Sequence, residues 1–535
     1  MPAKRKNDFD VIIIGSGMGA LSAASIFAQM KKKRVLVLER HFVIGGFTHM
    51  FKRKGKYEWD VGVHYIGDMA KGSMPRALFD YITQGKLKWN KMPDTYDVFL
   101  YPDLTFNARD GAENYKQELI TLFPYEETAI IKYFDDVKKV VNWSARYFVT
   151  KTFSSKIDFI SSALTLPGSE LALMTTKEYL DKNFRDEKLK AILVSQWGDY
   201  GLPPSVSAFA THATINSHYF NGAYYPVGGA KSIADGVIPI VKEAGGDLLI
   251  NHTVDEIIIE NGKAVGVKVT HKKGNDLIKK EFYADTIISD AGAYNTYNRL
   301  IPENIHIPFR NEIDEFSPGT AHVSLYVGLN DDPRKHGFQG ENYWIYSSYD
   351  HDTRFANRNE LLNGKVTGMY VSFPSVKDPE AKGHTMEILA FLDYEPFKKW
   401  VEQSWLKRDE EYVKLKTDIS DALINFVTQK LPTLKDLIEY TELSTPLTTE
   451  HFTGHPAGGI YGLPATPEKF KKKWLGIHTP IKNLYMVGAD SLMLGLLPAM
   501  MSGALAYGVI EGIPLNLIKV FSTAMKYSKS INVTE

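Results

Sequence analysis

The sequence predicts an α/β protein of more than one domain, built on a parallel sheet flanked by helices. An apolar, mostly β-branched run at residues 11–14 leads into three glycines and then an alanine-rich segment, a pattern typical of a strand, a tight loop and a helix. A second apolar run at residues 34–38 predicts the next parallel strand. With 535 residues, the chain is too long for a single hydrophobic core.

The glycine loop of this first unit predicts a dinucleotide site of the Rossmann type. Gly15 would allow the tight turn out of the strand, Gly17 would let the backbone approach a pyrophosphate, and Ala20 would let the helix pack closely on the sheet. The N-terminus of the helix would direct its free N–H groups at the phosphates. Glu39 ends the second strand at about the 20-residue distance where an acidic side chain binds the ribose hydroxyls. The expected contacts of this unit are Gly15, Ser16, Gly17, Met18, Gly19, Ala20, Glu39 and Arg40.

The composition excludes several classes of protein. Basic and acidic residues number 63 each, so no net field recruits nucleic acid. The chain contains no cysteine, which excludes disulfides, thiolate metal sites and a cysteinyl-linked flavin. The lack of cysteine fits a reducing compartment, and the basic N-terminus runs into Asp8 and Asp10 rather than into the apolar core of a signal peptide. We therefore expect a cytoplasmic protein.

Two segments have the sequence pattern of a membrane span and of a metal site, neither of which we expect here. Residues 491–510 carry no charge, but Gly495 and Pro498 among them favour a buried helix that faces a cofactor over a membrane span. His451 and His455 have the spacing of two metal ligands on a helix. The glycines and proline around them disfavour a helix, so no metal site is expected.

Two further motifs follow Glu39. The first is a second glycine pair with its neighbours Gly45, Gly46, Phe47 and Thr48. It would bring another loop close over the cofactor. The second is the alternating apolar pattern of residues 57–63, which predicts a short strand with His64 and Tyr65 at its end.

Together these motifs resemble the phytoene-desaturase-related FAD oxidoreductases. The resemblance rests on the loop of residues 15–20, Glu39, the glycine pair and the pattern Asp60-x-Gly-x-His-Tyr-Ile-Gly67. Within that superfamily, the sequence is most similar to the all-trans-retinol 13,14-reductase (retinol saturase) branch. Further blocks that agree lie at residues 198–203, 222–229, 373–379 and 483–490. The resemblance therefore spans nearly the whole chain.

The resemblance implies non-covalent FAD held by a discontinuous Rossmann-like domain with a three-stranded β insertion, plus an α+β substrate-binding domain. The FAD-binding domain would comprise residues 9–75, 222–297 and 470–528, and the substrate-binding domain residues 76–221 and 298–469. Residues 76–221 are expected to be mostly helical. By the same resemblance, Val254 would hold the adenine through its backbone, Asp490 a ribityl hydroxyl, and a helix starting at Pro498 would point at the flavin ring. The further cofactor contacts that we expect are Gly45, Gly46, Phe47, Thr48, His64, Gly488 and Met500.

The reaction that we expect is saturation or desaturation of a carbon–carbon bond in a long apolar polyene, retinoid-like or carotenoid-like. A flavin would carry the hydride chemistry, and the protein would supply position, a dry site and a proton. His64 and Tyr65 are the preferred proton-transfer candidates, and Asp199 and Tyr200 are weaker ones. No second glycine motif of the same type follows, so the electron partner would be NAD(P)H, a quinone, oxygen or a protein that docks transiently.

Two other functions stay open on the sequence. One is a non-redox isomerase or hydratase of an unsaturated fatty acid or carotenoid that keeps FAD. The other is a non-catalytic prenyl-lipid binding protein of the same fold. Amine oxidation is a third fold-level relative, which the retinol-saturase-like blocks disfavour.

An aromatic-rich stretch also allows three interpretations. Trp143, Tyr147, Phe148, Phe153, Phe159 and Ile160 lie close together in the sequence. They could form the core of a helical cap, line an apolar tunnel or contact a membrane surface peripherally. In each case the expected partner is an apolar small molecule or lipid, and the oligomeric state is not predicted.

Overall fold

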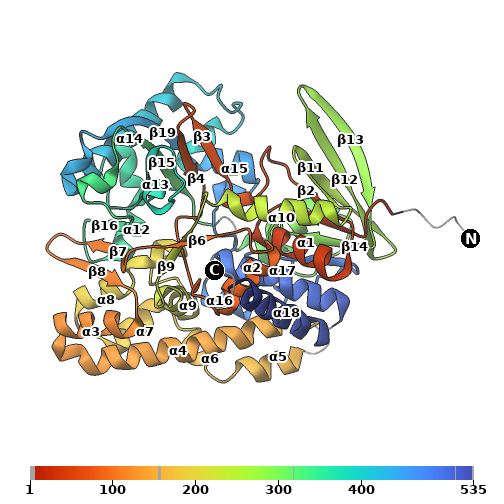
Figure 1. The fold of residues 1–535 in the computed structure, drawn as a ribbon, viewed down its shortest axis with the longest axis horizontal. Coiled ribbons are helices and arrows are strands. Elements are labelled where there is room, and N and C mark those ends of the chain that lie inside the picture. Colours follow the sequence, from red (N-terminus) through yellow and green to blue (C-terminus); the bar gives the residue numbers. More distant parts are fainter. Residues whose placement is uncertain (1–6, 155–157, 317–318, 513, 533–535) are drawn as a thin grey trace, which may run out of the picture.

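The computed structural model describes residues 7–154, 158–316, 319–512 and 514–532. Figure 1 shows a parallel-sheet region at the right, a large mixed sheet at the upper left and a layer of helices below. The chain enters the parallel-sheet region three times, with widely separated segments. The domain boundaries given above stay a prediction.

The five-stranded parallel sheet forms the centre of the Rossmann-like region. In spatial order its strands are β10 (Asp247–Leu249), β2 (Val35–Leu38), β1 (Val11–Ile14), β14 (Thr286–Ser289) and β20 (Leu484–Met486). All residues of β1 and β2 are buried, as expected for a sheet covered on both faces. The predicted strand–loop–helix–strand unit is confirmed.

Helices cover one face of this sheet. They are α1 (Met18–Lys31), α2 (Met74–Ile82), α10 (Lys231–Glu243), α17 (Leu496–Glu511) and α18 (Leu515–Asn532). Val11 and Ile13 of β1 pack in the same core as α1 and α17, whereas Ile12 and Ile14 face the opposite side. The alternation follows the two-residue period of a strand, so each face of β1 builds its own core.

The opposite face carries the predicted three-stranded insertion, which projects at the upper right of Figure 1. It consists of β11 (His252–Glu260), β12 (Lys263–Lys273) and β13 (Asp276–Tyr283). Asn261 and Gly262 both have positive φ (51° and 74°), as a two-residue hairpin turn requires. A π-helix (Asn295–Leu300) packs beside β11 in the same core.

The second region contains a seven-stranded mixed sheet. In spatial order its strands are β19 (Ile438–Ser444), β15 (His322–Leu329), β18 (His384–Phe391), β17 (Gly368–Ser372), β16 (Asn342–Tyr346), β7 (Thr95–Leu100) and β8 (Thr105–Arg109). Its helices are α12 (His351–Ala356), α13 (Pro374–Lys377), α14 (Glu410–Lys430) and α15 (Pro446–Thr453). Helix α11 (Arg310–Asp314) packs in the core of the three-stranded insertion, and α16 (Pro467–Lys471) packs through Phe470 against Trp143 and Tyr147.

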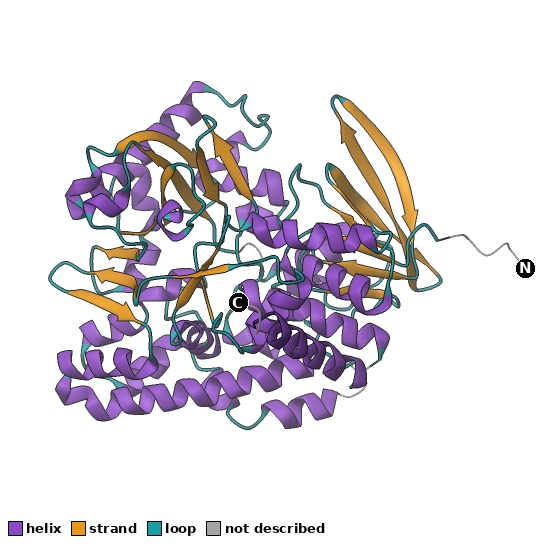
Figure 2. Ribbon diagram, in the orientation of Figure 1, coloured by secondary structure: helices purple, strands orange, loops and turns teal. Residues whose placement is uncertain are grey.

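Below the mixed sheet lies a helical layer, which Figure 2 shows in purple along the lower edge. Its helices are α3 (Ala112–Leu122), α4 (Glu127–Thr150), α5 (Asp158–Thr165), α6 (Ser169–Ala172), α7 (Thr176–Asn183), α8 (Glu187–Leu193) and α9 (Phe209–Tyr219). The expectation of a mostly helical segment needs one correction. Residues 89–109 form three strands, two of which extend the mixed sheet: β7 pairs with β16, and β8, whose buried residues alternate, pairs with β7.

Two small sheets join the regions. They are β3 (Met50–Arg53) with β4 (Tyr57–Asp60), and β5 (Ile66–Gly67) with β9 (Ala223–Pro226) and β6 (Trp89–Lys91). The strand expected over residues 57–63 ends at Asp60. The Asp60 carboxylate accepts hydrogen bonds from Ala230 N (2.9 Å) and the Tyr225 hydroxyl, which holds the chain as it turns away.

The uncharged segment at residues 491–510 forms α17, which packs against α1. A Cβ at Gly503 would lie 2.6 Å from both Ala23 N and Gly19 O, so only glycine lets the two backbones approach this closely. The helix begins at Leu496, two residues before the predicted start at Pro498, because a proline is tolerated anywhere in a first turn whose N–H groups lack helical partners. Within the described ranges, no helix has the length and apolar character needed to cross a membrane.

This close approach predicts different costs for one substitution at two glycines of the same helix. Gly503→Ala should destabilise the protein by about 1 to 3 kcal/mol, since backbone atoms of α1 must move. Gly508→Ala, whose new methyl group would meet Leu517 at 3.0 Å, should stay within about 1 kcal/mol of wild type because helix propensity offsets the contact. The midpoint of urea unfolding checks this. Equal midpoints for the two variants would show that the α1–α17 contact is not tight.

Candidate active site

A cavity of about 560 Å³ lies between the carboxyl ends of the parallel strands and one face of the mixed sheet. Its nucleotide end is lined by the loop after β1 and by residues that follow β2, β14 and β20. Its far end is lined by residues of β16, β17, β18 and α12. Ligands of open parallel sheets bind at the carboxyl ends of the strands, so the position is the expected one.

The loop after β1 surrounds a carboxyl group that the sequence interpretation missed. Asp290 follows β14, and its Oδ2 accepts a hydrogen bond from Ala20 N at 3.2 Å, near the start of α1. A Cβ at Gly17 would lie 2.5 Å from Asp290 Oδ2, and one at Gly488 would lie 2.3 Å from Oδ1. Burial raises the pKa of Asp290 to about 7. The glycines at these positions therefore make room for this side chain, while Gly15 to Met18 line the cavity.

Glu39 is fixed in the cavity wall. Ser16 donates to Glu39 Oε2 from both its backbone N (3.0 Å) and its hydroxyl (2.6 Å), and His41 N donates to Oε1 at 2.7 Å. Burial raises the pKa of Glu39, and the hydrogen bonds oppose that shift. Arg40 also lines the cavity.

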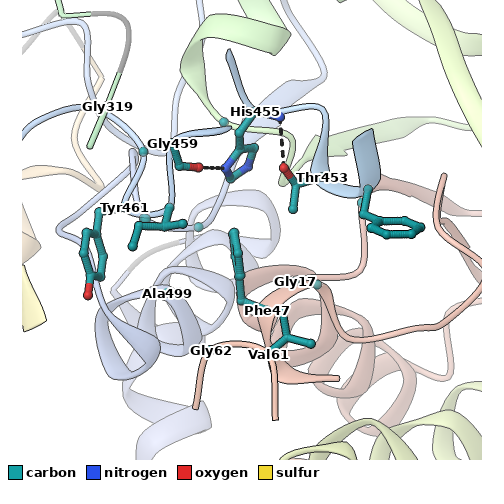
Figure 3. Close-up of a pocket in the computed structure, with 18 of the residues that line it drawn as sticks. Gly17, Phe47, Val61, Gly62, Gly319, Thr453, His455, Gly459, Tyr461 and Ala499 are labelled. Atoms are coloured by element: carbon teal, nitrogen blue, oxygen red, sulfur yellow. Dashed lines mark hydrogen bonds between the residues drawn. The ribbon is translucent and has the colours of Figure 1, made fainter. Parts of the chain in front are cut away.

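The second glycine pair closes over the first loop. Gly45 N donates to the Ser16 hydroxyl at 2.9 Å, and a Cβ at Gly46 would lie 3.0 Å from Gly17 Cα. Figure 3 shows Phe47 pointing toward His455, with the ring centroids 5.8 Å apart. Gly46, Phe47 and Thr48 line the cavity, as does His455 from the segment after α15.

Val254 and Asp490 line the same end of the cavity. Asp490 accepts hydrogen bonds from Leu463 N through Oδ1 and from Ala293 N through Oδ2, both at 2.8 Å. Asp490 therefore connects the loop that begins at Gly488 to two other segments, the one before α16 and the turn after β14.

Five of the predicted cofactor contacts lie outside the cavity wall. They are Gly19, Ala20, Gly45, Pro498 and Met500. At the start of α17 the wall is formed instead by Gly495, Leu496 and Ala499, because the helix begins before the proline and turns other residues inward.

His64 lies among buried charges. Its Nδ1 is 2.8 Å from Glu387 Oε2, without the alignment of a hydrogen bond. Lys377 Nζ donates to the His64 carbonyl oxygen at 2.8 Å. Burial lowers the pKa of His64 to about 4 and of Lys377 to about 8, and it raises the pKa of Glu387 to about 8. His64 is therefore neutral at pH 7.

Tyr65 bridges two carboxyl groups behind the wall. Its hydroxyl lies 2.9 Å from Asp199 Oδ2 and 3.0 Å from Asp97 Oδ2. Asp97 also accepts hydrogen bonds from Gln196 Nε2 (2.8 Å) and Asn342 Nδ2 (2.9 Å), which stabilise its charged form. Burial and then the charge of Asp97 raise the pKa of Asp199 to about 8, whereas that of Asp97 is raised to about 6. Of these three groups, only Asp199 lines the cavity.

Tyr200 is buried outside the cavity wall, where its hydroxyl lies 3.3 Å from His212 Nδ1; its predicted catalytic role stays a prediction. The six aromatic and apolar residues of the stretch at residues 143–160 do not line this cavity among the described residues either: Trp143 and Tyr147 are buried in the helical core, whereas Phe159 is 72% exposed. Contact with a membrane surface stays a prediction.

The histidine pair after α14 is arranged differently from our expectation. His451 lies on helix α15, which ends at Thr453, and His455 lies beyond the break at Gly454. Glycine ends this helix rather than preventing it, because Gly454 takes the left-handed conformation. Among the described residues, no cluster of three metal-ligating side chains is found.

Comparison with known proteins agrees with this geometry. The family described as NAD(P)-binding Rossmann-like domain matches residues 13–82. An all-trans-retinol 13,14-reductase of Danio rerio is 33% identical, over 98% of this chain and 89% of its own length. Prolycopene isomerase 1 of an Oncidium hybrid cultivar is 28% identical, over 91% of this chain and 81% of its own length.

Among solved structures, a redesigned putrescine oxidase superposes with a TM-score of 0.61 at 15% identity, covering 94% of this chain and 99% of its own, and this likeness shows the shared fold. The identity to the reductase over nearly the full length is the stronger finding, and it agrees with the motif resemblance in the sequence. The chain belongs to the all-trans-retinol 13,14-reductase family.

Proposed function

We propose that this chain is an FAD-dependent oxidoreductase that saturates a carbon–carbon double bond of a long apolar polyene. The observation that carries the proposal is one continuous cavity whose nucleotide end has the Rossmann loop and whose far end has aromatic walls, with Asp199 in its lining. The relatives named all-trans-retinol 13,14-reductase support the reaction, and the cavity supplies a place for a chain-like substrate.

The residues present fit FAD. Glu39 lies at the carboxyl end of β2, where it can bind ribose hydroxyls, and Gly17 and Gly46 approach so closely that a Cβ at Gly46 would meet Gly17. Val254 lies beside Glu39 at the edge expected for the adenine, and Gly488 and Leu496 lie toward the flavin end. FAD bound here would supply reversible hydride transfer. Electrons would come from NAD(P)H or a quinone that docks transiently.

Asp199 is the proton donor that the geometry supports best. Saturation of a double bond consumes one proton besides the hydride, and at pH 7 neutral His64 has no extra proton to give. Protonated Asp199 would donate to the Tyr65 oxygen or to a substrate carbon, while the Tyr65 hydroxyl donates to charged Asp97. Tyr65 keeps its own proton, because burial raises its pKa well above the ordinary value. Tyr65 and Asp97 are thus positioning residues.

The cofactor assignment predicts the effect of neutralising Glu39. Glu39→Gln should weaken FAD binding roughly 10- to 100-fold, since a charged hydrogen-bond acceptor for the ribose is lost. Flavin released from the purified protein, measured by absorbance, checks this. Glu256→Gln on β11, which removes a surface partner of Lys268, should keep wild-type FAD content. Equal FAD content in both variants would argue against the ribose contact.

The proton-donor assignment predicts a pH profile. The holoprotein is reduced under nitrogen and mixed with all-trans-retinol as the probe polyene, and the loss of polyene absorbance gives the rate. Because the acid must be protonated, the rate should fall as the pH rises through about 8, the pKa of Asp199. Asp199→Asn should slow the reaction about 10²- to 10⁴-fold.

Asp97→Asn provides the matched control. It removes the charge that raises the pKa of Asp199, so the falling limb should move to lower pH while the reaction persists. If Asp199→Asn reacted at the wild-type rate, or if Asp97→Asn left the falling limb of the pH profile at the same pH, Asp199 would not be the proton donor.

A further inference from the structure

A buried cation closes the far end of the cavity. Arg354 on α12 is only 7% exposed and lines the cavity, yet none of the described acidic side chains forms an ion pair with it. Its Nε donates to the Thr367 carbonyl oxygen at 2.7 Å, and its Nη1 lies 2.8 Å from His351 Nδ1. Its guanidinium carbon lies 4.1 Å from the ring centroid of Tyr346. Every one of these partners is neutral.

His351 cannot neutralise the arginine. Its Nδ1 also accepts a hydrogen bond from Trp197 Nε1 at 2.9 Å, which fixes this nitrogen as an acceptor, and burial holds the pKa of His351 well below its ordinary value. An arginine side chain stays protonated in proteins. Asp350 at the start of α12 acts on the guanidinium through its charge but forms no ion pair with it. A buried charge without an ion-pair partner is costly, so a ligand anion in the cavity would stabilise this cation.

The guanidinium keeps N–H donors that such a ligand can use. Nη2 donates no hydrogen bond among the described residues, and a Cβ at Gly368 would lie 2.3 Å from it. Glycine at the start of β17 therefore leaves the space that the planar group occupies. Nη1 has one hydrogen-bond partner among the described residues, His351 Nδ1, so the two terminal nitrogens keep N–H donors for the two oxygens of a carboxylate.

The path from His64 to Arg354 is apolar and follows the strands of the mixed sheet. Tyr370 of β17 pairs with Trp344 of β16, and two residues along the same strands Gly368 pairs with Tyr346. The Tyr370 ring lies 5.4 Å from the His64 ring, and two strand residues span about 7 Å. A chain that reaches past His64 along this aromatic wall therefore ends at Arg354.

We infer that the substrate of the proposed reduction carries a terminal carboxylate, which the Arg354 guanidinium binds while the unsaturated chain extends along the Tyr370 and Tyr346 wall toward His64. A hydroxyl head group would accept a hydrogen bond but leave the buried charge uncompensated. The substrate class is thus an unsaturated apolar acid. This inference rests on the proposed function for the reaction, but the head-group preference is a property of binding and is measured separately.

The test uses three probes that share one polyene: all-trans-retinoic acid, its methyl ester and all-trans-retinol. Quenching of tryptophan fluorescence in the holoprotein at pH 7 gives their dissociation constants, since Trp344 lines the cavity. The acid should bind at least roughly 10-fold more tightly than the ester or the alcohol. Arg354→Met should weaken binding of the acid roughly 10- to 100-fold and leave the ester within about twofold.

Two further variants serve as controls for the effect of Arg354→Met. Arg358→Met, one turn away, removes an arginine that is paired with Asp393 and lies outside the cavity wall, so it should leave all three constants unchanged. Arg354→Lys, which retains a cation without the fork, should weaken the acid less than Arg354→Met does and serves if the methionine variant does not fold.

Equal binding of acid and ester by the wild type, or an equal loss for both in Arg354→Met, would overturn the inference. Failure of the reduced holoprotein to convert any of the probes would instead count against the proposed function, because binding is read without turnover.

Discussion

The carboxyl group of Asp290 near the start of α1 is the contact on which the nucleotide half of the molecule depends. It fills the space that Gly17, Gly19 and Gly488 leave open, and so it brings the loop after β1, the end of β14 and the loop after β20 to one point. Because Gly503 lets α17 cross α1 at backbone distance nearby, residues almost 500 positions apart form one end of the cavity. Asp490 adds a second tie from this loop to the turn after β14.

The other half of the cavity depends on a balance of buried charge. The buried lysine Lys377 lies within electrostatic reach of several carboxyl groups, among them those of Asp60, Asp97, Asp199 and Glu387. Burial raises the pKa of each carboxyl group, so at neutral pH some of them keep their protons. Such a group of acids is costly for stability but gives a dry cavity a proton to donate. Arg354, a buried cation without an ion pair among the described residues, lies at the far end of the cavity. The acids and this cation therefore lie at different positions along the same cavity.

Much of the nucleotide half could be predicted from the sequence because its signals are local. The strand, glycine loop, helix and acid from Val11 to Glu39 arrive in order, and the strand before Gly488 follows the same logic. The start of α17 was misplaced because proline is equally compatible with several positions of a first turn. The strands in residues 89–109 were missed because short alternating runs between helices give a weak signal.

Most of the acid and cation sites could not be predicted. Asp97, Asp290 and Arg354 are ordinary charged residues in the sequence. Only contacts with segments distant along the chain bury Asp97 and Arg354 and bring Asp290 to the loop after β1. A partial signal existed for Asp290, which follows an apolar strand at the edge of the sheet where ligands bind. Arg354 had none, since two of its neutral partners, Tyr346 on β16 and Thr367 just before β17, come to it only in the folded chain.

A cavity with a nucleotide end, an acid and an apolar far end is built to add hydrogen to a carbon–carbon double bond. The most direct measurement is the mass of the product formed when the reduced holoprotein is incubated with a conjugated polyene acid under nitrogen. Saturation predicts a product heavier than the substrate by two hydrogen atoms. A product of unchanged mass, with the double bond moved or its geometry inverted, would contradict the account and identify an isomerase.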